Sequence, residues 1–318
     1  MSKAYFFNKG IDELAGKMRG NENIFLGIRP YGFHAGNKIP FIIYPLLLCE
    51  KYQEKQNKPP RFTFYVFLND WEQDGFDQTY TDIKTHPFNV IPKFTTFQYT
   101  LYESGGGGIV DFWESRIIDD MQIIIEKFPT INLRFVRNSY MRDNSITKDV
   151  VLKTINDPDL VGNVLRETTG REILSFPYSY CRPICPKCKT AKTEATVNGE
   201  MIHIVCKNCN LDKNYNYYSL NYWLYHKPLA LPRIAIYKID LCITGIDHYN
   251  EGDFKSRQKL FKAYNIKCKI PDMLYTPTLY GKNNLPMGKS KGNYEDIEIN
   301  SLYELVEKNL NKEKIYLK

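Results

Sequence analysis

Apolar stretches of strand length alternate with stretches of helix length along the first half of the chain, and this alternation limits the possible folds most. Residues 23–28 and 61–68 are short and rich in aromatic and aliphatic side chains, which predicts two buried strands. The apolar stretch 38–56 and the helically spaced apolar residues of 109–128 predict the helices that follow them. Strands that alternate with helices in this way predict an α/β fold with a mostly parallel sheet.

The pattern continues through the rest of the chain with one interruption. Two strands and two helices are predicted downstream, in the order strand, helix, strand, helix: 132–136, 147–168, 241–245 and 254–264. The first of these helices is broken near Asp157, which precedes a proline. Between residues 177 and 216, cysteine, lysine and asparagine become frequent. We therefore expect a small module inserted into the α/β domain.

The composition is that of an ordinary globular protein, with 43% hydrophobic and 25% charged residues in 318. It excludes wholesale disorder, collagen and coiled coil. The longest apolar run, residues 39–49, is too short to span a bilayer. Because no secretory signal is visible, we expect a cytoplasmic protein with no membrane partner. The net charge of +7 fits simple solubility or a polyanionic ligand such as nucleic acid.

Four cysteines form two Cys-x2-Cys pairs, Cys185 with Cys188 and Cys206 with Cys209, separated by 17 residues. This spacing is typical of a zinc ribbon, in which two tight turns direct four thiolates to one tetrahedral ion. All four coordination positions would be filled, so the predicted Zn²⁺ is structural. A set of free buried thiols is the alternative. An Asn-Gly pair at 198–199 predicts a hairpin between the two cysteine pairs.

Two short segments carry residues suited to phosphate chemistry. Residues 34–37 (HAGN) follow the first predicted strand, and residues 286–293 (PMGKSKGN) lie near the C-terminus. Either segment alone is a weak signal, because a lone histidine or a lysine-containing loop is commonly structural. Together and in this order on an α/β framework, they resemble the HIGH and KMSKS signatures of class I aminoacyl-tRNA synthetases.

A third segment agrees with this resemblance. Residues 245–248 (GIDH) end a predicted strand and resemble the G-x-D-H segment at the nucleotide and amino-acid site of these enzymes. The order of the parts is most similar to that of class I lysyl-tRNA synthetase. The sequence PICPKC at 183–188 is similar to the zinc entry of that family.

The resemblance implies a Rossmann-like core of the HUP type with a zinc ribbon inserted into it. The implied N-terminal half of the core covers residues 1–176, and the zinc-binding insertion covers 177–216. The C-terminal half of the core covers 217–300, and a C-terminal helix covers 301–318. It also implies activation of an amino acid, lysine, by ATP with Mg²⁺. The acceptor would be the end of a tRNA or a different molecule.

Residue roles follow from the same resemblance. The attack on ATP spreads negative charge over the phosphates, and hydrogen-bond donors or cations stabilise that charge. The implied catalytic residues are His34, Asn37 and Lys289. Asp247 would accept a hydrogen bond from the ribose hydroxyls. The implied ATP-binding residues are Gly32, Gly36, Gly245, Asp247, His248, Met287, Ser290 and Lys291.

The chain departs from the family pattern in four places. One residue separates Gly32 from His34, where the family usually has two. Pro286 stands where the first lysine of KMSKS is expected, and Gly288 stands where its first serine is expected. Residues 231–244 lack the Trp- and Asp-bearing run that helps to hold lysine in the family. Few residues follow Asn293, so the large C-terminal anticodon-binding region is expected to be absent.

Two other hypotheses fit these departures. The chain could be a non-catalytic synthetase paralogue that binds RNA or a protein partner. It could also be another nucleotidyl-transferring enzyme with an HxGH-type motif, although the cysteine module counts against this. The basic and aromatic stretch 207–225 could stack on a nucleic-acid end, or it could pack around the cysteine module.

Overall fold

The computed structural model describes residues 2–29, 34–71, 78–79, 90–91, 109–170, 179–287, 295–309 and 311–317. Its main sheet has six strands in the order β1-β13-β12-β2-β3-β6, and every neighbouring pair is parallel. The expected α/β fold with a parallel sheet is therefore confirmed. The six strands are β1 Ala4–Phe6, β13 Asp272–Thr276, β12 Leu241–Gly245, β2 Asn23–Ile28, β3 Thr63–Leu68 and β6 Asn132–Arg137.

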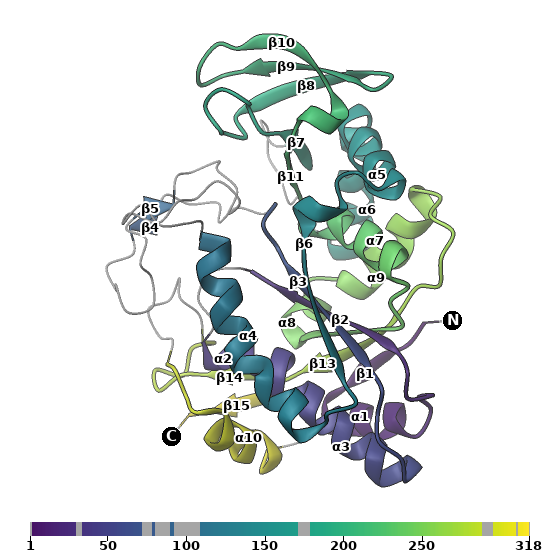
Figure 1. Cartoon of the computed structure of the whole chain (residues 1–318), viewed down its shortest axis with the longest axis vertical. Helices are drawn as coiled ribbons and strands as arrows, with labels where there is room; N and C mark the ends of the chain where they lie inside the picture. The colour runs from purple at the N-terminus through teal and green to yellow at the C-terminus, as the bar shows by residue number, and fades with distance from the viewer. Residues whose placement is uncertain are drawn as a thin grey trace.

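Helices cover both faces of this sheet (Figure 1). Alternate residues of β2 point to opposite faces, so that Ile24 and Leu26 join one hydrophobic cluster and Phe25 joins the other. The first cluster is completed by α1 Phe7–Ala15, α3 Tyr44–Gln56, α4 Ile109–Lys127 and α10 Ile299–Glu307. The second is completed by α5 Ser145–Asn156, α6 Pro158–Thr169, α7 His226–Tyr237 and α9 Asp253–Ala263.

Two irregularities interrupt the predicted helices, and the one at Asp157 was expected. Asp157 separates α5 from α6, and its carboxylate accepts a hydrogen bond from the Leu160 amide at 3.1 Å, which caps α6. Before α3, the short helix α2 (Ala35–Lys38) passes into a π-helical segment, η1 (Ile39–Ile43), that contains Pro40. This segment joins the site described below to the buried helix α3.

The inserted module lies at one end of the molecule, beyond α5 (Figure 1). It contains an antiparallel sheet of β8 Thr193–Asn198, β9 Met201–Cys206 and β10 Asp212–Asn216. The predicted hairpin turn is confirmed, with Gly199 at φ +60°. A two-stranded pair, β7 Cys181–Pro183 and β11 Tyr222–Leu224, connects the module to the core.

Several elements lack a signal in the sequence. The strands β1, β14 (Thr278–Tyr280) and β15 (Lys314–Tyr316) have three residues each, too few to show a period of two. Helix α10 ends at Glu307 and β15 follows, so the C-terminal helix is shorter than the predicted 301–318. The remaining short elements are β4 Gln78–Thr79, β5 Val90–Ile91, α8 Ile246–Asn250, η3 Asn138–Met141 and η4 Tyr217–Ser219. Within the described residues, no helix combines the length and hydropathy needed to span a membrane.

Candidate active site

A cavity of about 850 Å³ lies at the carboxyl-terminal edge of the main sheet. Its lining includes Gly27 near the end of β2, Asn69 after β3, Gly245 at the end of β12 and Thr276 at the end of β13. Open α/β sheets bind ligands in crevices at this edge. The Thr276 hydroxyl is buried there without a hydrogen-bond partner among the described residues.

His34 stands immediately before α2 and lines the cavity. Its Nδ1 atom accepts a hydrogen bond from the Gly36 amide at 3.1 Å, so a neutral ring carries its proton on Nε2. The amide of Ala35, which lies between His34 and Gly36 in the chain, donates to the Glu295 carbonyl at 3.2 Å. This contact ties the start of α2 to the segment that follows residues 288–294.

A side chain at Gly36 would crowd the His34 imidazole. A Cβ atom there would lie 3.0 Å from His34 Cε1 and 3.6 Å from Met287 Cβ. Met287 is fixed by its amide, which donates to the Leu279 carbonyl of β14 at 2.8 Å. Glycine at this position therefore avoids a tight contact with the imidazole, while the contact with Met287 would be an ordinary one.

At the end of β12, Gly245 leads into α8, which carries Asp247 and His248. The Asp247 carboxylate folds back over Gly245, at the point that a Cβ atom would occupy. His248 Nδ1 lies 3.1 Å from Asp253 Oδ2. Burial alone would lower the pKa of His248, but the hydrogen bond and charge of Asp253, with Asp247 and Glu251, raise it to about 9.

Asp253 also forms an ion pair with Lys227 of α7, and both residues are buried. Lys227 Nζ donates a further hydrogen bond to the Glu251 carbonyl at 3.1 Å. Burial alone would raise the pKa of Asp253, whereas His248, His226 and Lys227 hold it well below its usual range. The carboxylate is therefore ionised and bridges two cations beside the cavity.

A second polar network lies beneath the cavity. The Arg233 guanidinium of α7 donates to Asn138 Oδ1 at 2.9 Å and to Asn69 Oδ1 at 2.7 Å. The Asn138 amide donates to the same Asn69 oxygen at 2.6 Å. Arg233 also faces the rings of Phe25 and Phe67 at 5.8 and 5.7 Å. The network links the ends of β3 and β6 to α7.

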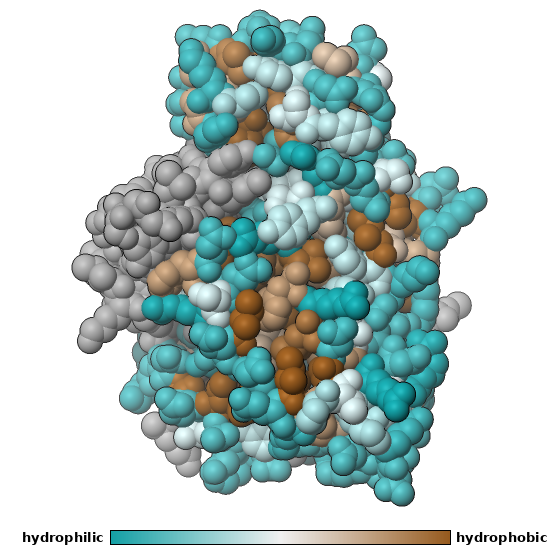
Figure 2. All heavy atoms as spheres, viewed as in Figure 1, coloured by the Kyte–Doolittle hydropathy of each residue, from teal (hydrophilic) through white to brown (hydrophobic). Residues whose placement is uncertain are grey.

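Three separate sequence segments thus contribute predicted residues to one cavity. All predicted catalytic and ATP-binding residues in the described part of the chain line the cavity: His34, Gly36, Asn37, Gly245, Asp247, His248 and Met287. The remaining predicted residues fall outside the described residues: Gly32, Lys289, Ser290 and Lys291. Figure 2 shows hydrophobic side chains gathered in the middle of the face below the inserted module, with hydrophilic residues around them.

The sequence motifs did not include Lys227, Arg233 or Asp253. One signal was available, because Lys227 and Arg233 are charged residues within the mainly apolar stretch 227–236 (KPLALPRIAI). Charged side chains are rarely buried without partners, so a helix of this composition predicts buried polar contacts. Their partners could not be identified, since Asn69 and Asn138 are far away in the sequence.

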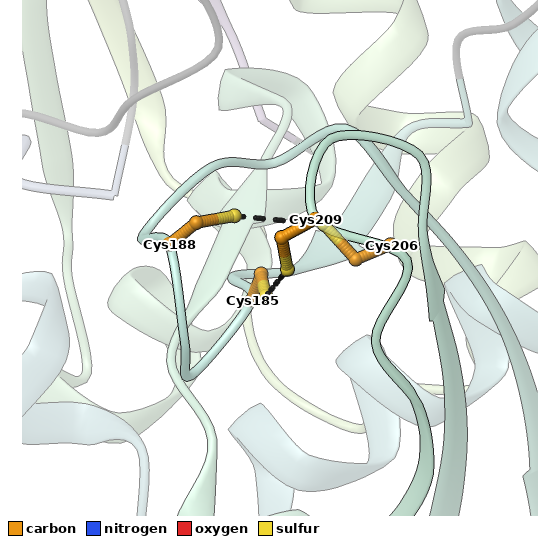
Figure 3. Close-up of side chains that lie close together, drawn as sticks. All are labelled: Cys185, Cys188, Cys206 and Cys209. Carbon is orange, nitrogen blue, oxygen red and sulfur yellow. Dashed lines mark hydrogen bonds between the residues drawn. The ribbon is translucent and has the colours of Figure 1, made fainter.

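The four cysteines of the inserted module lie together (Figure 3). Their ligand atoms are all within 4.8 Å of one another, and two of the Sγ–Sγ distances are 3.6 Å, from Cys185 to Cys209 and from Cys188 to Cys206. A tetrahedral Zn²⁺ with Zn–S bonds of about 2.3 Å requires sulfur atoms about 3.8 Å apart. The four thiols therefore fit a metal ion such as zinc.

The family of the chain follows from a comparison of its sequence with family models. The model described as tRNA synthetases class I (K) matches residues 108–311, which is more than half of the chain. The chain therefore belongs to the class I tRNA synthetases. The matched range contains the four cysteines, the segment 245–248 and Met287, whereas His34 lies before it.

Solved structures of class I synthetases resemble the chain at low identity. The tyrosyl-tRNA synthetase of Archaeoglobus fulgidus has 15% identity and a TM-score of 0.42, covering 91% of this chain and 65% of its own. The tyrosyl-tRNA synthetase of Leishmania major has 10% identity and a TM-score of 0.44, covering 89% and 30%. The glutamate-tRNA synthetase of Elizabethkingia anophelis has 13% identity and a TM-score of 0.39, covering 86% and 53%.

The chain spans less than two thirds of the length of each of these three structures. No curated protein matches its sequence.

Proposed function

We propose that the chain activates an amino acid with ATP, forming an aminoacyl-adenylate and releasing pyrophosphate. The observation that carries this proposal is the convergence of segments 34–37, 245–248 and Met287 on one cavity at the carboxyl-terminal edge of the sheet. The buried Thr276 hydroxyl adds a polar group in the same lining. Membership of the class I tRNA synthetases supports the same reaction.

The proposed roles follow the chemistry of the side chains. With Nδ1 engaged by Gly36, His34 can donate from Nε2 to a phosphate oxygen as charge develops. Asn37 would add an amide donor from the same segment. Lys289 would stabilise the leaving pyrophosphate, and Ser290 and Lys291 would contact the phosphates. Mg²⁺ would accompany ATP and neutralise part of its charge.

The other proposed nucleotide contacts surround this centre. Gly32 and Gly36 would allow the nucleotide to approach the backbone, and Gly245 would do the same at the end of β12. Asp247 would accept a hydrogen bond from a ribose hydroxyl, with His248 and Met287 beside it.

We propose lysine as the amino acid, on the strength of the sequence resemblance. Residues 231–244 contribute Arg233 and no carboxylate to the cavity, because Asp240 instead pairs with Arg19 and the Asn23 amide. Of the acidic residues that line the cavity, Asp253 is engaged by Lys227 and His248. With Asp247 assigned to the ribose, the candidates among the described residues for binding an ε-ammonium group are Glu251 and Glu313.

The remaining parts of the proposal concern the module, the acceptor and the compartment. Cys185, Cys188, Cys206 and Cys209 would hold one structural Zn²⁺ in the insertion at 177–216. The acceptor would be the end of a tRNA or a different molecule. The proposed compartment is the cytoplasm, where reducing conditions keep cysteines as thiols.

The test is ATP–pyrophosphate exchange with each of the twenty amino acids in turn. We expect exchange with lysine, and we expect His34→Ala and Lys289→Ala to lower it roughly a hundredfold while both variants stay folded. His203→Ala is the matched control, because His203 lies on β9 of the inserted module, away from the cavity. Exchange with another amino acid would overturn the lysine assignment alone. No exchange with any amino acid would overturn the proposal, and tRNA binding by such a protein would favour the non-catalytic hypothesis.

A further inference from the structure

Asp253 joins two cationic residues at one corner of the cavity. Its Oδ2 atom lies 3.1 Å from His248 Nδ1, and its Oδ1 atom forms an ion pair with Lys227. Asp253 is 7% exposed and Lys227 is 6% exposed, whereas 39% of the His248 side chain is exposed because it faces the cavity. A buried carboxylate therefore holds a histidine that a ligand can reach.

The backbone fixes Asp253 in this position. Asp253 is the first residue of α9 and follows Gly252, whose φ of +75° lies in the left-handed region. A Cβ atom on Gly252 would lie 2.8 Å from Thr169 Cγ2, so the turn between α8 and α9 requires glycine. The short turn places the carboxylate directly against the preceding helix, which carries His248.

The charges that face His248 come from three helices. They are Asp247 on α8 and Glu251 at its C-terminal end, Asp253 and Arg257 on α9, and His226 and Lys227 on α7. Arg257 donates to the Cys242 sulfur at 3.0 Å, and no carboxylate of the described residues forms an ion pair with it. Asp247, Glu251 and Asp253 thus set three carboxylates against Lys227, Arg257 and a protonated His248. Loss of the His248 proton would make this corner negative and would repel an anion.

We propose that Asp253 is a positioning residue that holds His248 as a charged donor, so that its Nε2–H binds an anionic oxygen of the substrate. That oxygen belongs either to a phosphate of ATP or to the carboxylate of the amino acid. Asp253 occupies Nδ1, and Nε2 has no partner among the described residues. Charge-assisted hydrogen bonds of this kind are shorter and stronger than neutral ones. The inference rests on the proposed function, since it assigns a role within the same cavity.

This arrangement has a consequence for the pH range of binding. Burial opposes the charged ring, but Asp253 raises the pKa of His248 to about 9. The donor therefore stays charged at pH 8, where an ordinary histidine with a pKa of about 6.5 would be almost entirely neutral. Asp253→Asn removes the carboxylate charge and returns the His248 pKa toward or below that ordinary value.

The experiment combines nuclear magnetic resonance with calorimetry on the full chain. The chain has five histidines, and the His248 ring resonance is identified by its absence from His248→Gln. We expect this resonance to titrate near pH 9 in the unmodified protein and at least two pH units lower in Asp253→Asn. We also expect the dissociation constant for ATP, or for the amino acid that supports exchange, to weaken about tenfold between pH 6.5 and 8 in Asp253→Asn only.

Comparing ATP with the amino acid identifies which anionic group His248 binds. A pH-dependent affinity for ATP alone assigns the phosphate, and one for the amino acid alone assigns the carboxylate. A His248 pKa near 6.5 in the unmodified protein would overturn the inference. The inference would also be overturned if, for both ligands, the dissociation constant depended on pH in the same way in the unmodified protein and in Asp253→Asn.

Controls separate positioning from folding and from catalysis. Glu167→Gln removes an exposed carboxylate that pairs with Lys259 of the same helix α9, and it should leave both profiles unchanged. If Asp253→Asn fails to fold because Lys227 is left unpaired, the double variant with Lys227→Met removes both members of the buried pair. The titration of His248 and the calorimetry with ATP require no turnover, so they test the inference separately from the exchange assay.

Discussion

Lys38 Nζ lies 2.7 Å from Asp296 Oδ1, which joins α2 to the segment 295–298. Lys38 is only 5% exposed, and its ammonium group also lies 3.7 Å from Asp120 Oδ2 of α4. A second contact of the same two segments is the hydrogen bond from the Ala35 amide to the Glu295 carbonyl. Two polar contacts thus connect α2, which His34 precedes, with the stretch that follows residues 288–294.

Lys38→Met should weaken this connection while keeping most of the apolar volume of the side chain. We expect the free energy of unfolding to fall by about 1 kcal/mol, because both carboxylates remain partly solvated. We also expect the ATP dissociation constant to rise. A loss of stability of this size leaves the protein folded, so it would not by itself raise that constant. Urea denaturation and calorimetry measure the two effects. Lys308→Met, which removes an exposed i,i+4 pair with Glu304, is the control. Unchanged ATP affinity in Lys38→Met would contradict the prediction.

Gly36→Ala tests the position of the His34 imidazole beside Gly36. The added methyl group would lie 3.0 Å from His34 Cε1, so the imidazole has to move by a few tenths of an ångström or more. We expect exchange activity to fall roughly tenfold to a hundredfold, because small displacements of a catalytic group are costly. The free energy of unfolding should change by about 1 kcal/mol or less.

The control for this variant is Gly162→Ala on α6. There the nearest atoms to a new Cβ belong to Tyr180 at 3.5 Å, an ordinary contact. We expect this variant to keep full activity and to gain about 1 kcal/mol in stability, since alanine favours helix over glycine. Equal activity of the Gly36 and Gly162 variants would count against a positioning role for Gly36.

The sequence predicted the parts of the fold that have a clear period. The strand at 23–28 and the break at Asp157 follow from local hydrophobicity and helix-start chemistry, and the structure confirms both. The three-residue strand β1 carries no such period. In the site, motifs predicted residues next to one another in sequence, whereas the contact of Asp253 with Lys227 joins two different helices. A contact of that kind depends on how α7 and α9 pack, which no local pattern specifies.

Asn138→Ala tests the polar network beneath the cavity. Asn138 Oδ1 accepts from Arg233 Nε, and removing it leaves a buried guanidinium with one acceptor fewer. We expect a loss of about 1–3 kcal/mol in the free energy of unfolding, measured by urea denaturation. Asn163→Ala is the control, because Asn163 contacts the exposed Arg166 on α6. A loss no greater than that of the control would show that the network contributes little to stability.

Cys188→Ser tests the metal site of the inserted module. We expect the unmodified protein to contain one Zn²⁺ per chain by elemental analysis, and the variant to lose it, because three thiolates and a hydroxyl bind zinc more weakly. The thermal unfolding midpoint should fall by several degrees, since Ile202 and Ile204 of the module belong to a core cluster that it shares with the main domain. Cys268→Ser is the control, because Cys268 lies outside the four-cysteine cluster. Full zinc content in Cys188→Ser would contradict this assignment.

The pH dependence of stability tests the His248 environment without any ligand. A histidine whose pKa is higher in the folded state stabilises the fold fully below its unfolded pKa, and this contribution is lost as the pH rises through the folded value. For His248 the unfolded pKa is about 6.5, and the folded pKa is raised to about 9. The thermal unfolding midpoint should therefore fall between pH 7 and pH 9.5 more steeply in the unmodified protein than in His248→Gln. His203→Gln, a change on the exposed side of β9, should keep the slope of the unmodified protein. Identical slopes for the unmodified protein and His248→Gln would contradict the stabilising role of the ion pair with Asp253.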